Sequence, residues 1–171
     1  MSSLVDATRY PASACTDGDA STLCASDIEA NAWLSVNIAA GSRIDYVAIV
    51  NRGDNAVYQA WLSPFEVYVG SSYGDLGYKC SGPTSVPVGA GPFLISCGGT
   101  SAGAYVTLRL TGPQPGDRYL TVADLSVYSA QAPPLPPPPP PSPSPLPSPP
   151  PPFGAPQSTL ATKEEEFAAA G

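Results

Sequence analysis

Apolar and polar residues alternate along several short stretches of this chain, and Gly, Pro, Ser and Asn separate the stretches. A period of two is typical of half-buried β-strands, and a helical period is nearly absent. We expect strands at residues 33–38, 43–50, 65–69, 93–97, 105–110 and 119–128. Many short strands with turn residues between them predict an all-β fold, an antiparallel β-sandwich or jelly roll.

The strand pattern stops near residue 131. Residues 132–157 hold 16 of the 23 prolines, and residues 158–171 are short and acidic. We therefore predict a β-sandwich domain at 1–131, a proline-rich stalk at 132–157, and a tail at 158–171 that is disordered or forms a short helix. A proline run favours the polyproline II helix, at about 3.1 Å per residue, which suits a spacer. The alternative is a ligand for a proline-binding domain.

Charge and cysteine content narrow the function classes. The net charge is −7 and the basic residues do not cluster, so the footprint of nucleic-acid binding is missing. No run of about 18 apolar residues predicts a membrane span. Four cysteines without any histidine favour two disulfides and an oxidising compartment over a zinc site. Because the start of the chain lacks the features of a secretory signal, we expect a fragment of a longer secreted protein.

Two carboxylates lie close together in a glycine turn. Asp17 and Asp19 flank Gly18, a spacing that lets carboxylate and nearby carbonyl oxygens converge on a hard cation. Ca²⁺ takes about 6–8 oxygen ligands and tolerates irregular geometry. The alternative is a solvated turn, in which Asp and Gly serve only the turn geometry.

Four segments, in order, resemble motifs of the F-type lectin (fucolectin) family, within the discoidin-like galactose-binding jelly rolls. They resemble its Asp-Gly-Asn/Asp loop, its W-x-V-D-L strand, its N-R-x-D turn and its closing L-x-L-C-E-V-x-V strand. The segments are residues 14–19, 33–38, 51–54 and 120–127. The resemblance covers roughly residues 2–128 and implies a galactose-binding-like sandwich that binds glycans.

The resemblance also implies a structural calcium ion. In that family, the Asp-Gly loop and the acidic residue of the last strand bind it together. The implied ligands here are the Ala14 carbonyl, Asp17, Asp19, an oxygen of Ser21 or Thr22, the Ala123 carbonyl and Asp124. The family usually has Glu where this chain has Asp124.

Two disulfide pairings follow from the same resemblance. Cys80 and Cys97 match a cysteine pair of the family. Cys24 matches a cysteine whose usual partner precedes the last-strand acid, where this chain has Ala123. Cys15 is the cysteine that is left, so the implied pairs are Cys15–Cys24 and Cys80–Cys97. A loop of about 10 residues closed in this way gains on the order of 2–3 kcal/mol.

The implied sugar site is degenerate. The family binds fucose through a histidine, the Arg of R-x-D and a second basic residue, beside a platform made by a cysteine pair. The matching positions here are Ser26 (or Ala25) for the histidine, Arg52 and Asp54 for R-x-D, Gln59 for the second basic residue, and Asn55 and Ala56 for the platform. Each lost charged hydrogen bond costs about 1.5–3 kcal/mol, so the usual fucose affinity is not expected. Arg52 and Asp54 could instead form a structural pair within the turn.

Aromatic residues offer a further way to hold a sugar. Tyr58, Trp61, Tyr73 and Tyr78 fall in or near predicted loops, where an exposed ring can stack on the C–H face of a sugar. Core packing is the alternative, favoured for Trp33 and open for Trp61.

The sequence thus predicts a secreted, lectin-like carbohydrate-binding module of a cell wall or cell surface, whose partner is a glycan or a cell-wall glycoprotein. Its serine–proline repeats resemble the hydroxyproline-rich glycoproteins of plant and green-algal cell walls. The alternative is a structural or adhesion module without sugar binding. An enzyme is not expected, because the chain has no histidine for acid–base work and no G-x-S-x-G motif.

Overall fold

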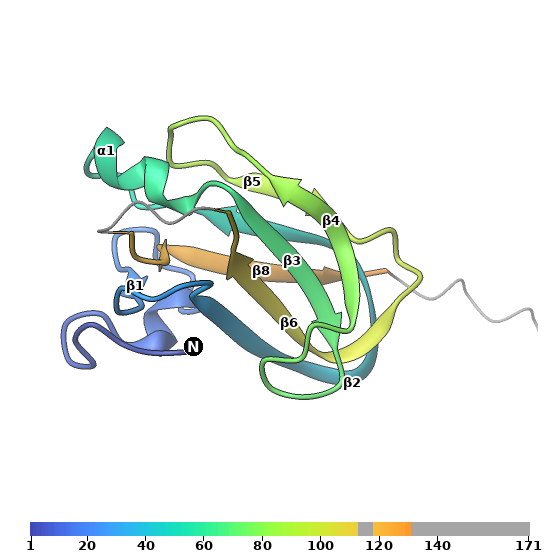
Figure 1. The fold of residues 1–171 in the computed structure, drawn as a ribbon. Helices are drawn as coiled ribbons and strands as arrows, with labels where there is room; N and C mark the ends of the chain where they lie inside the picture. Colours follow the sequence, from blue (N-terminus) through green and yellow to red (C-terminus); the bar gives the residue numbers. More distant parts are fainter. Residues whose placement is uncertain (113–117, 131–171) are drawn as a thin grey trace, which may run out of the picture. The chain divides into compact units, whose positions relative to one another are not determined.

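Strands make up most of the regular structure in residues 1–112 and 118–130, the part of the chain that the computed structural model describes (Figure 1). The elements in chain order are the 3₁₀ helix η1 (Ala12–Cys15), β1 (Cys24–Ala25), β2 (Trp33–Val50), α1 (Ala56–Gln59), the 3₁₀ helix η2 (Ala60–Leu62), β3 (Phe65–Gly70), β4 (Tyr78–Thr84), β5 (Phe93–Ser96), β6 (Ala102–Leu110), β7 (Thr121–Val122) and β8 (Asp124–Ser129). The predicted stalk and tail lie outside the described residues. No helix of the described part is long and apolar enough to cross a membrane.

Strand β2 builds both layers of the sandwich. Its first half, Trp33 to Asn37, pairs with β6, and its second half, Ile44 to Val50, pairs with β5 and β8. The pairing register shifts between Asn37 and Ser42, where Gly41 has a φ of 81°. A glycine tolerates this left-handed conformation without strain. The bulge therefore turns one strand from the first layer into the second.

All strand pairs are antiparallel, and the two layers enclose the core. One layer has the order β4-β3-β6-β2, and the other is β5-β2-β8. The fully buried side chains Val67 and Leu108 come from the first layer, and Val47 and Ile49 from the second. The predicted antiparallel β-sandwich is confirmed, because both layers contribute fully buried side chains to one core.

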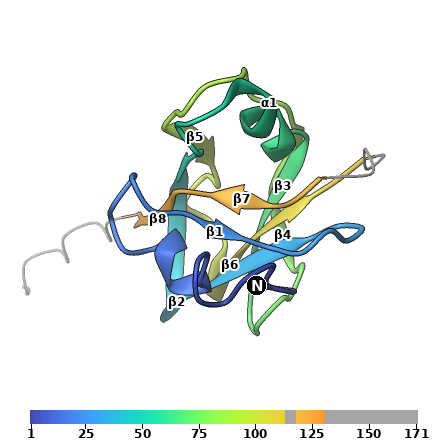
Figure 2. The same ribbon diagram turned by 90° about the vertical axis from the view of Figure 1, so that its left-hand side faces the viewer.

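A small second sheet lies at one end of the sandwich. Strands β1 and β7 pair with each other, with Cys24 opposite Val122. Figure 2 shows this pair together with the N-terminal segment and α1 on the side that faces the viewer. This is also the end at which β2 finishes, so the segment after Val50 enters the same group of loops.

The structure differs from the expected strands in four places, one of which is β1, a two-residue strand that the pattern did not predict. The segments expected at 33–38 and 43–50 are one bent strand, because the residues between them form a bulge and not a hairpin turn. The segment expected at 119–128 divides into β7 and β8 on either side of Ala123. Strand β4 was not expected, because Gly82 and Pro83 within it are typical of turns.

Candidate functional site

Arg52 lies in the turn that follows β2, and Asn51 fixes the shape of this turn. The Asn51 side chain is 1% exposed. Its Nδ2 donates to the carbonyl oxygens of Gln59, at 2.9 Å, and Gly89, at 3.3 Å. Its Oδ1 accepts from the Arg52 backbone N–H at 2.9 Å. One buried amide thus links three chain segments and fixes the position of the Arg52 backbone.

Arg52 and Asp54 form a two-bond ion pair. Arg52 Nε donates to Asp54 Oδ1, and Arg52 Nη2 donates to Asp54 Oδ2, both at 2.7 Å. The Arg52 side chain is 12% exposed and that of Asp54 is 57% exposed. The hydrogen bond raises the pKa of Arg52 and lowers the pKa of Asp54. The pair fixes the guanidinium plane, and Nη1 takes no part in either bond.

A row of aromatic rings begins beside this guanidinium. The Arg52 Cζ lies 4.5 Å from the centre of the Tyr58 ring. The Tyr58 and Trp61 rings are 4.6 Å apart, and the Trp61 and Tyr119 rings are 5.2 Å apart. A pocket of about 200 Å³ opens beside this row. Its lining residues are Val5, Tyr10, Leu23, Ala25, Arg52, Trp61, Tyr119 and Thr121. We call it the Arg52 pocket.

Arg118 holds the backbone of Trp61. This arginine is 2% exposed, and burial lowers the pKa of its guanidinium. Its Nε donates to the Trp61 carbonyl at 2.8 Å, its Nη2 to the Pro64 carbonyl at 2.7 Å, and its Nη1 to the Thr111 carbonyl at 3.3 Å. Tyr119 follows Arg118 directly in the chain. The same segment therefore supplies one wall of the Arg52 pocket, Tyr119, and the side chain that holds a second wall residue, Trp61.

Of the four residues predicted for the sugar site, Arg52 lines this pocket, whereas Asp54, Gln59 and Ser26 do not. Ser26 is 0% exposed, its Oγ donates to the Asp27 carbonyl at 2.8 Å, and the same Oγ accepts from the Leu120 N–H at 2.9 Å. Ser26 therefore does not line the pocket, because its hydroxyl is hydrogen-bonded inside the fold, whereas the alternative position, Ala25, does. Gln59 is half-buried and contributes its backbone carbonyl to Asn51.

Of the predicted aromatic residues, Trp61 lines the pocket and Tyr58 packs between it and Arg52. Tyr73 contacts Trp33 elsewhere on the sandwich, with the ring centres 4.8 Å apart. Tyr10 and Tyr119 are lining residues that the sequence did not reveal. Tyr10 stands alone in a loop and Tyr119 in an expected strand, so neither carried a local signal.

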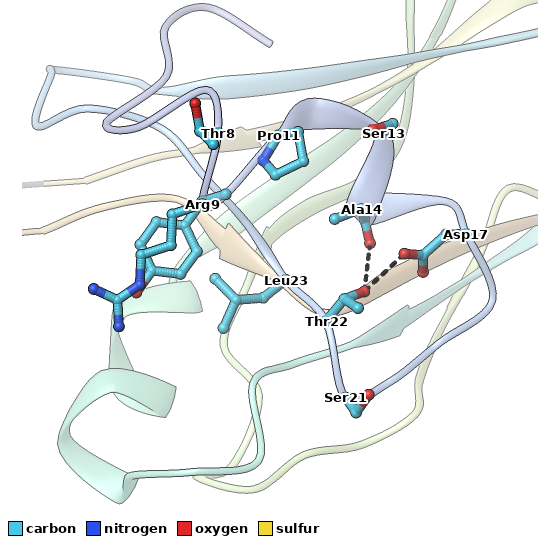
Figure 3. A pocket seen from close by; sticks show the side chains of 10 residues that line it. Thr8, Arg9, Pro11, Ser13, Ala14, Asp17, Ser21, Thr22 and Leu23 are labelled. Atoms are coloured by element: carbon cyan, nitrogen blue, oxygen red, sulfur yellow. Dashed lines mark hydrogen bonds between the residues drawn. The ribbon is translucent and has the colours of Figure 1, made fainter.

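A second hollow of about 510 Å³ adjoins the first and shares Tyr10 and Leu23 with it. Figure 3 shows the Thr22 hydroxyl directed toward the Ala14 carbonyl and the Asp17 carboxylate. Thr22 Oγ1 lies 2.8 Å from Asp17 Oδ2, 3.0 Å from the Asp19 carbonyl oxygen and 3.5 Å from the Ala14 carbonyl oxygen. One hydroxyl proton cannot serve three acceptors. Carbonyl, carboxylate and hydroxyl oxygens are the ligands that Ca²⁺ prefers, so this donor set fits the ion.

The other predicted calcium ligands are placed differently. Asp19 Oδ1 accepts from the Ser21 N–H at 2.9 Å and from the Ser21 hydroxyl at 2.6 Å, which lowers the pKa of Asp19. Asp124 Oδ2 accepts from the Ser126 hydroxyl at 2.9 Å, and Ala123 is buried. Within residues 1–112 and 118–130, no three His, Cys, Asp or Glu side chains form a metal-holding group, so Asp124 does not complete an acidic cluster with Asp17 and Asp19.

Both predicted disulfides are present. Cys15 bonds to Cys24 across a sequence separation of 9, with 5.2 Å between their Cα atoms. Cys80 bonds to Cys97 across a separation of 17, with 4.3 Å between their Cα atoms. The first bridge closes the loop that carries Asp17 and Asp19. The second joins β4 of one layer to the residue that follows β5 of the other.

No protein-family model matches the sequence, and no curated protein matches it. Solved structures match the fold. A serum fucolectin of striped bass (Morone saxatilis) has a TM-score of 0.63 and 22% identity, over 75% of this chain and 45% of that one, so this chain spans less than half the length of that lectin. A fucose-binding module of Streptococcus pneumoniae has a TM-score of 0.60 and 18% identity, over 76% of this chain and 91% of that one.

A chitosan-binding module from a Paenibacillus chitosanase/glucanase has a TM-score of 0.58 and 21% identity, over 75% of this chain and 91% of that one. These neighbours are carbohydrate-binding proteins, and they bind different sugars. The described part of this chain therefore has the galactose-binding-like β-sandwich fold that F-type lectins share with other carbohydrate-binding modules.

Proposed function

We propose that this chain is an extracellular carbohydrate-binding module that holds a neutral sugar in the Arg52 pocket. One observation carries the proposal. A guanidinium with a paired charge lies beside three aromatic rings, those of Tyr10, Trp61 and Tyr119, in a hollow of about 200 Å³. The structural neighbours use the same fold to bind sugars.

The arrangement favours a neutral ligand. Asp54 already balances the charge of Arg52 through two short hydrogen bonds. What Arg52 can still offer is directional N–H donation from Nη1 to a sugar oxygen. The Trp61 and Tyr119 rings offer flat apolar faces for the C–H face of a pyranose. The polar edge of the sugar would meet the guanidinium, and its apolar face would meet the aromatic rings. Small-molecule pockets orient their ligands in this way.

Fucose is not the preferred sugar under this proposal. The family's histidine position falls on Ala25, a methyl group, or on Ser26, which is buried. Gln59 does not line the pocket. Two of the three cationic or imidazole donors are thus missing, at a cost of about 1.5–3 kcal/mol for each charged hydrogen bond. Aromatic contact takes over the larger share of the binding.

The neighbouring loop is proposed as a calcium site. Asp17, Thr22 and the carbonyls of Ala14 and Asp19 would hold the ion. Bound Ca²⁺ would supply a positive charge that keeps these oxygens together and stiffens the loop beside the Arg52 pocket. Tyr10 and Leu23, which line both hollows, are the route by which a stiffer loop preserves the pocket wall.

The setting of the module is proposed from the sequence. Two disulfides suit secretion. The proline-rich segment at 132–157 would act as a spacer, and its serine–proline repeats point to a cell wall or cell surface. The ligand would then be a wall polysaccharide or the glycan of a wall glycoprotein.

A glycan array tests the proposal. The wild-type protein is compared with Arg52→Ala and with Arg43→Ala, which removes an exposed arginine of β2 outside the Arg52 pocket. We expect neutral glycans to bind the wild-type and Arg43→Ala proteins and to lose binding to Arg52→Ala. An array on which the wild-type protein binds nothing supports the structural or adhesion module instead. Binding that survives Arg52→Ala places the site elsewhere.

A further inference from the structure

A third pocket, of about 300 Å³, lies on the face of β2 and β6 and shares no residue with the Arg52 pocket. Its lining residues are Ala30, Asn31, Trp33, Gly74, Leu76 and Arg109. Trp33 and Arg109 are directly opposite each other in the antiparallel register of β2 and β6. Residues in this relation project from the same face of a sheet. We call this hollow the Arg109 pocket.

The positive charge of Arg109 is not fully balanced by its neighbours. Glu66 is its register partner on β3. However, Glu66 Oε1 accepts from Lys79 Nζ at 2.6 Å, and Glu66 Oε2 accepts from the Tyr68 hydroxyl. Both carboxylate oxygens are therefore engaged, and the group of Glu66, Lys79 and Arg109 carries one excess positive charge. Within residues 1–112 and 118–130, the Arg109 side chain has no hydrogen bond and no ion pair, although its backbone pairs with β2 and β3.

Trp33 forms a fixed apolar wall beside this charge. The Tyr73 ring packs edge-on against it, with the ring centres 4.8 Å apart and an angle of 71° between the planes. Gly74, at a φ of +75°, lies so close that a Cβ there would come within 3.1 Å of the indole. The Gly74 N–H donates to Ser35 Oγ at 3.3 Å, which fastens the loop to β2. The wall is thus set before any ligand arrives.

The acidic side chain of the loop that contains Gly74 is Asp75, and it forms hydrogen bonds within the loop. Asp75 Oδ2 accepts from the Ser71 N–H at 2.8 Å and from the Ser71 hydroxyl at 3.0 Å. It closes the turn between β3 and β4. Asp75 keeps its negative charge but does not line the pocket, and Arg109 is the one charged residue among those that do, although the chain as a whole carries −7.

We propose that the Arg109 pocket binds an acidic sugar, with the anionic group, a carboxylate or a sulfate ester, on the Arg109 guanidinium and the pyranose ring against Trp33 and Leu76. A guanidinium presents a planar fork of N–H donors that matches such anions in two-bond geometry. An indole face suits the C–H face of a pyranose. The volume is at the lower end of small-molecule sites, about 300–1,000 Å³, which suits a single sugar unit.

The two tryptophans of the chain make the test specific, because one lines each pocket. In the variant Trp61→Phe, only Trp33 reports by fluorescence. This variant is titrated with D-galacturonic acid, D-galactose 6-sulfate and neutral D-galactose, with free sulfate and a short poly-glutamate peptide in parallel. We expect a saturable change with one or both acidic sugars and none with galactose. Whichever acid responds identifies the anionic group.

Arg109→Gln in the same background should weaken binding of the acidic sugar about tenfold or more, as expected for the loss of a charged hydrogen bond. Arg52→Gln should leave it unchanged, so this outcome does not depend on the neutral-sugar proposal. Equal melting temperatures show that the variants fold. The proposal is overturned if neither acidic sugar gives a saturable change, if galactose, free sulfate or the peptide responds equally well, or if binding survives Arg109→Gln in the folded protein.

Discussion

At the scale of single residues, Arg118 and Asn51 support the Arg52 pocket without lining it. Arg118 satisfies three backbone carbonyls, one of which belongs to Trp61. Asn51 joins the turn of Arg52 to two other segments. Buried polar groups of this kind are costly to leave unpaired, at about 1–3 kcal/mol for each group. The positions of Arg52 and Trp61 are therefore set by side chains behind them.

Replacing Arg118 by methionine should destabilise the fold and loosen Trp61. Methionine fills much of the space but donates to none of the three carbonyls, so we expect a loss of about 3 kcal/mol or more of unfolding free energy in urea. Arg43→Met, at an exposed position, should change it by less than about 0.5 kcal/mol. An Arg118→Met protein as stable as Arg43→Met would show that these hydrogen bonds contribute little.

The pairing of Asp54 with Arg52 predicts how binding depends on pH. Because the hydrogen bond from Arg52 lowers the pKa of folded Asp54 below its usual value of about 3.9, the pair is intact above that value and is lost as the pH falls through the lowered pKa. Sugar affinity, measured by titration calorimetry, should be constant from neutral pH down to about pH 4 and fall below it. Arg52 then loses the partner that orients it.

Asp54→Asn should bind more weakly at neutral pH and lose the decline in acid. Asp75→Asn is the matched control, since the pKa of this carboxyl is also lowered, by its hydrogen bonds with Ser71 away from the Arg52 pocket. It should keep the affinity and the decline. An acid decline in Asp54→Asn equal to that of the wild-type protein would assign the pH dependence to another group.

At the scale of elements, the sequence revealed what local patterns encode. Alternation of apolar and polar residues identified the strands around Trp33, Val67 and Leu108, although β3 is buried on both faces. It could not reveal that β2 passes through a bulge and serves both layers, since a glycine followed by serine also signals a turn. It missed β4, whose Gly82 and Pro83 are tolerated at a sheet edge.

The site was predictable where it rests on short motifs. The ion pair of Arg52 with Asp54 was one of two interpretations left open for this turn, and the two disulfides were implied by a family resemblance. Ser26 illustrates the limit, because a shift of one residue along an extended chain exchanges the pocket face for the buried face. Arg118 and Tyr119 could not be assigned locally, since Arg118 and Trp61 are 57 residues apart in sequence.

The loop closed by Cys15 and Cys24 carries the prediction at this scale. If Asp17 and Thr22 help to hold Ca²⁺, millimolar calcium should raise the melting temperature, because a ligand that binds only the folded state stabilises it. Asp17→Asn should abolish most of this rise. Replacing both cysteines by serine should lower the unfolding free energy by about 2–3 kcal/mol and weaken the calcium effect.

Asp27→Asn is the control for charge, because Asp27 is exposed and lies outside the loop. Its response to calcium should match that of the wild-type protein. Equal melting temperatures of the wild-type protein with calcium and with a chelator would contradict the calcium site and leave the sugar pocket untouched.

At the scale of the whole molecule, the sandwich acts as a rigid support for separate hollows. The bend of β2 and the Cys80–Cys97 bridge hold the two layers together. The Arg52 pocket and the Arg109 pocket have no lining residue in common, so each can be altered without changing the other's lining. A neutral sugar at one and an acidic sugar at the other would let one domain read two features of a single polysaccharide.

The most direct measurement of the central claim is the NMR signal of the Trp61 indole N–H. The chain has two tryptophans, so two indole signals are expected, and Trp61→Phe assigns them. We predict that at least one of L-fucose, D-galactose, D-mannose and N-acetyl-D-glucosamine shifts the Trp61 signal to saturation and leaves the Trp33 signal in place, and that Arg52→Ala removes the shift. A Trp61 signal that none of these sugars moves, or that moves equally in folded Arg52→Ala, would contradict the account.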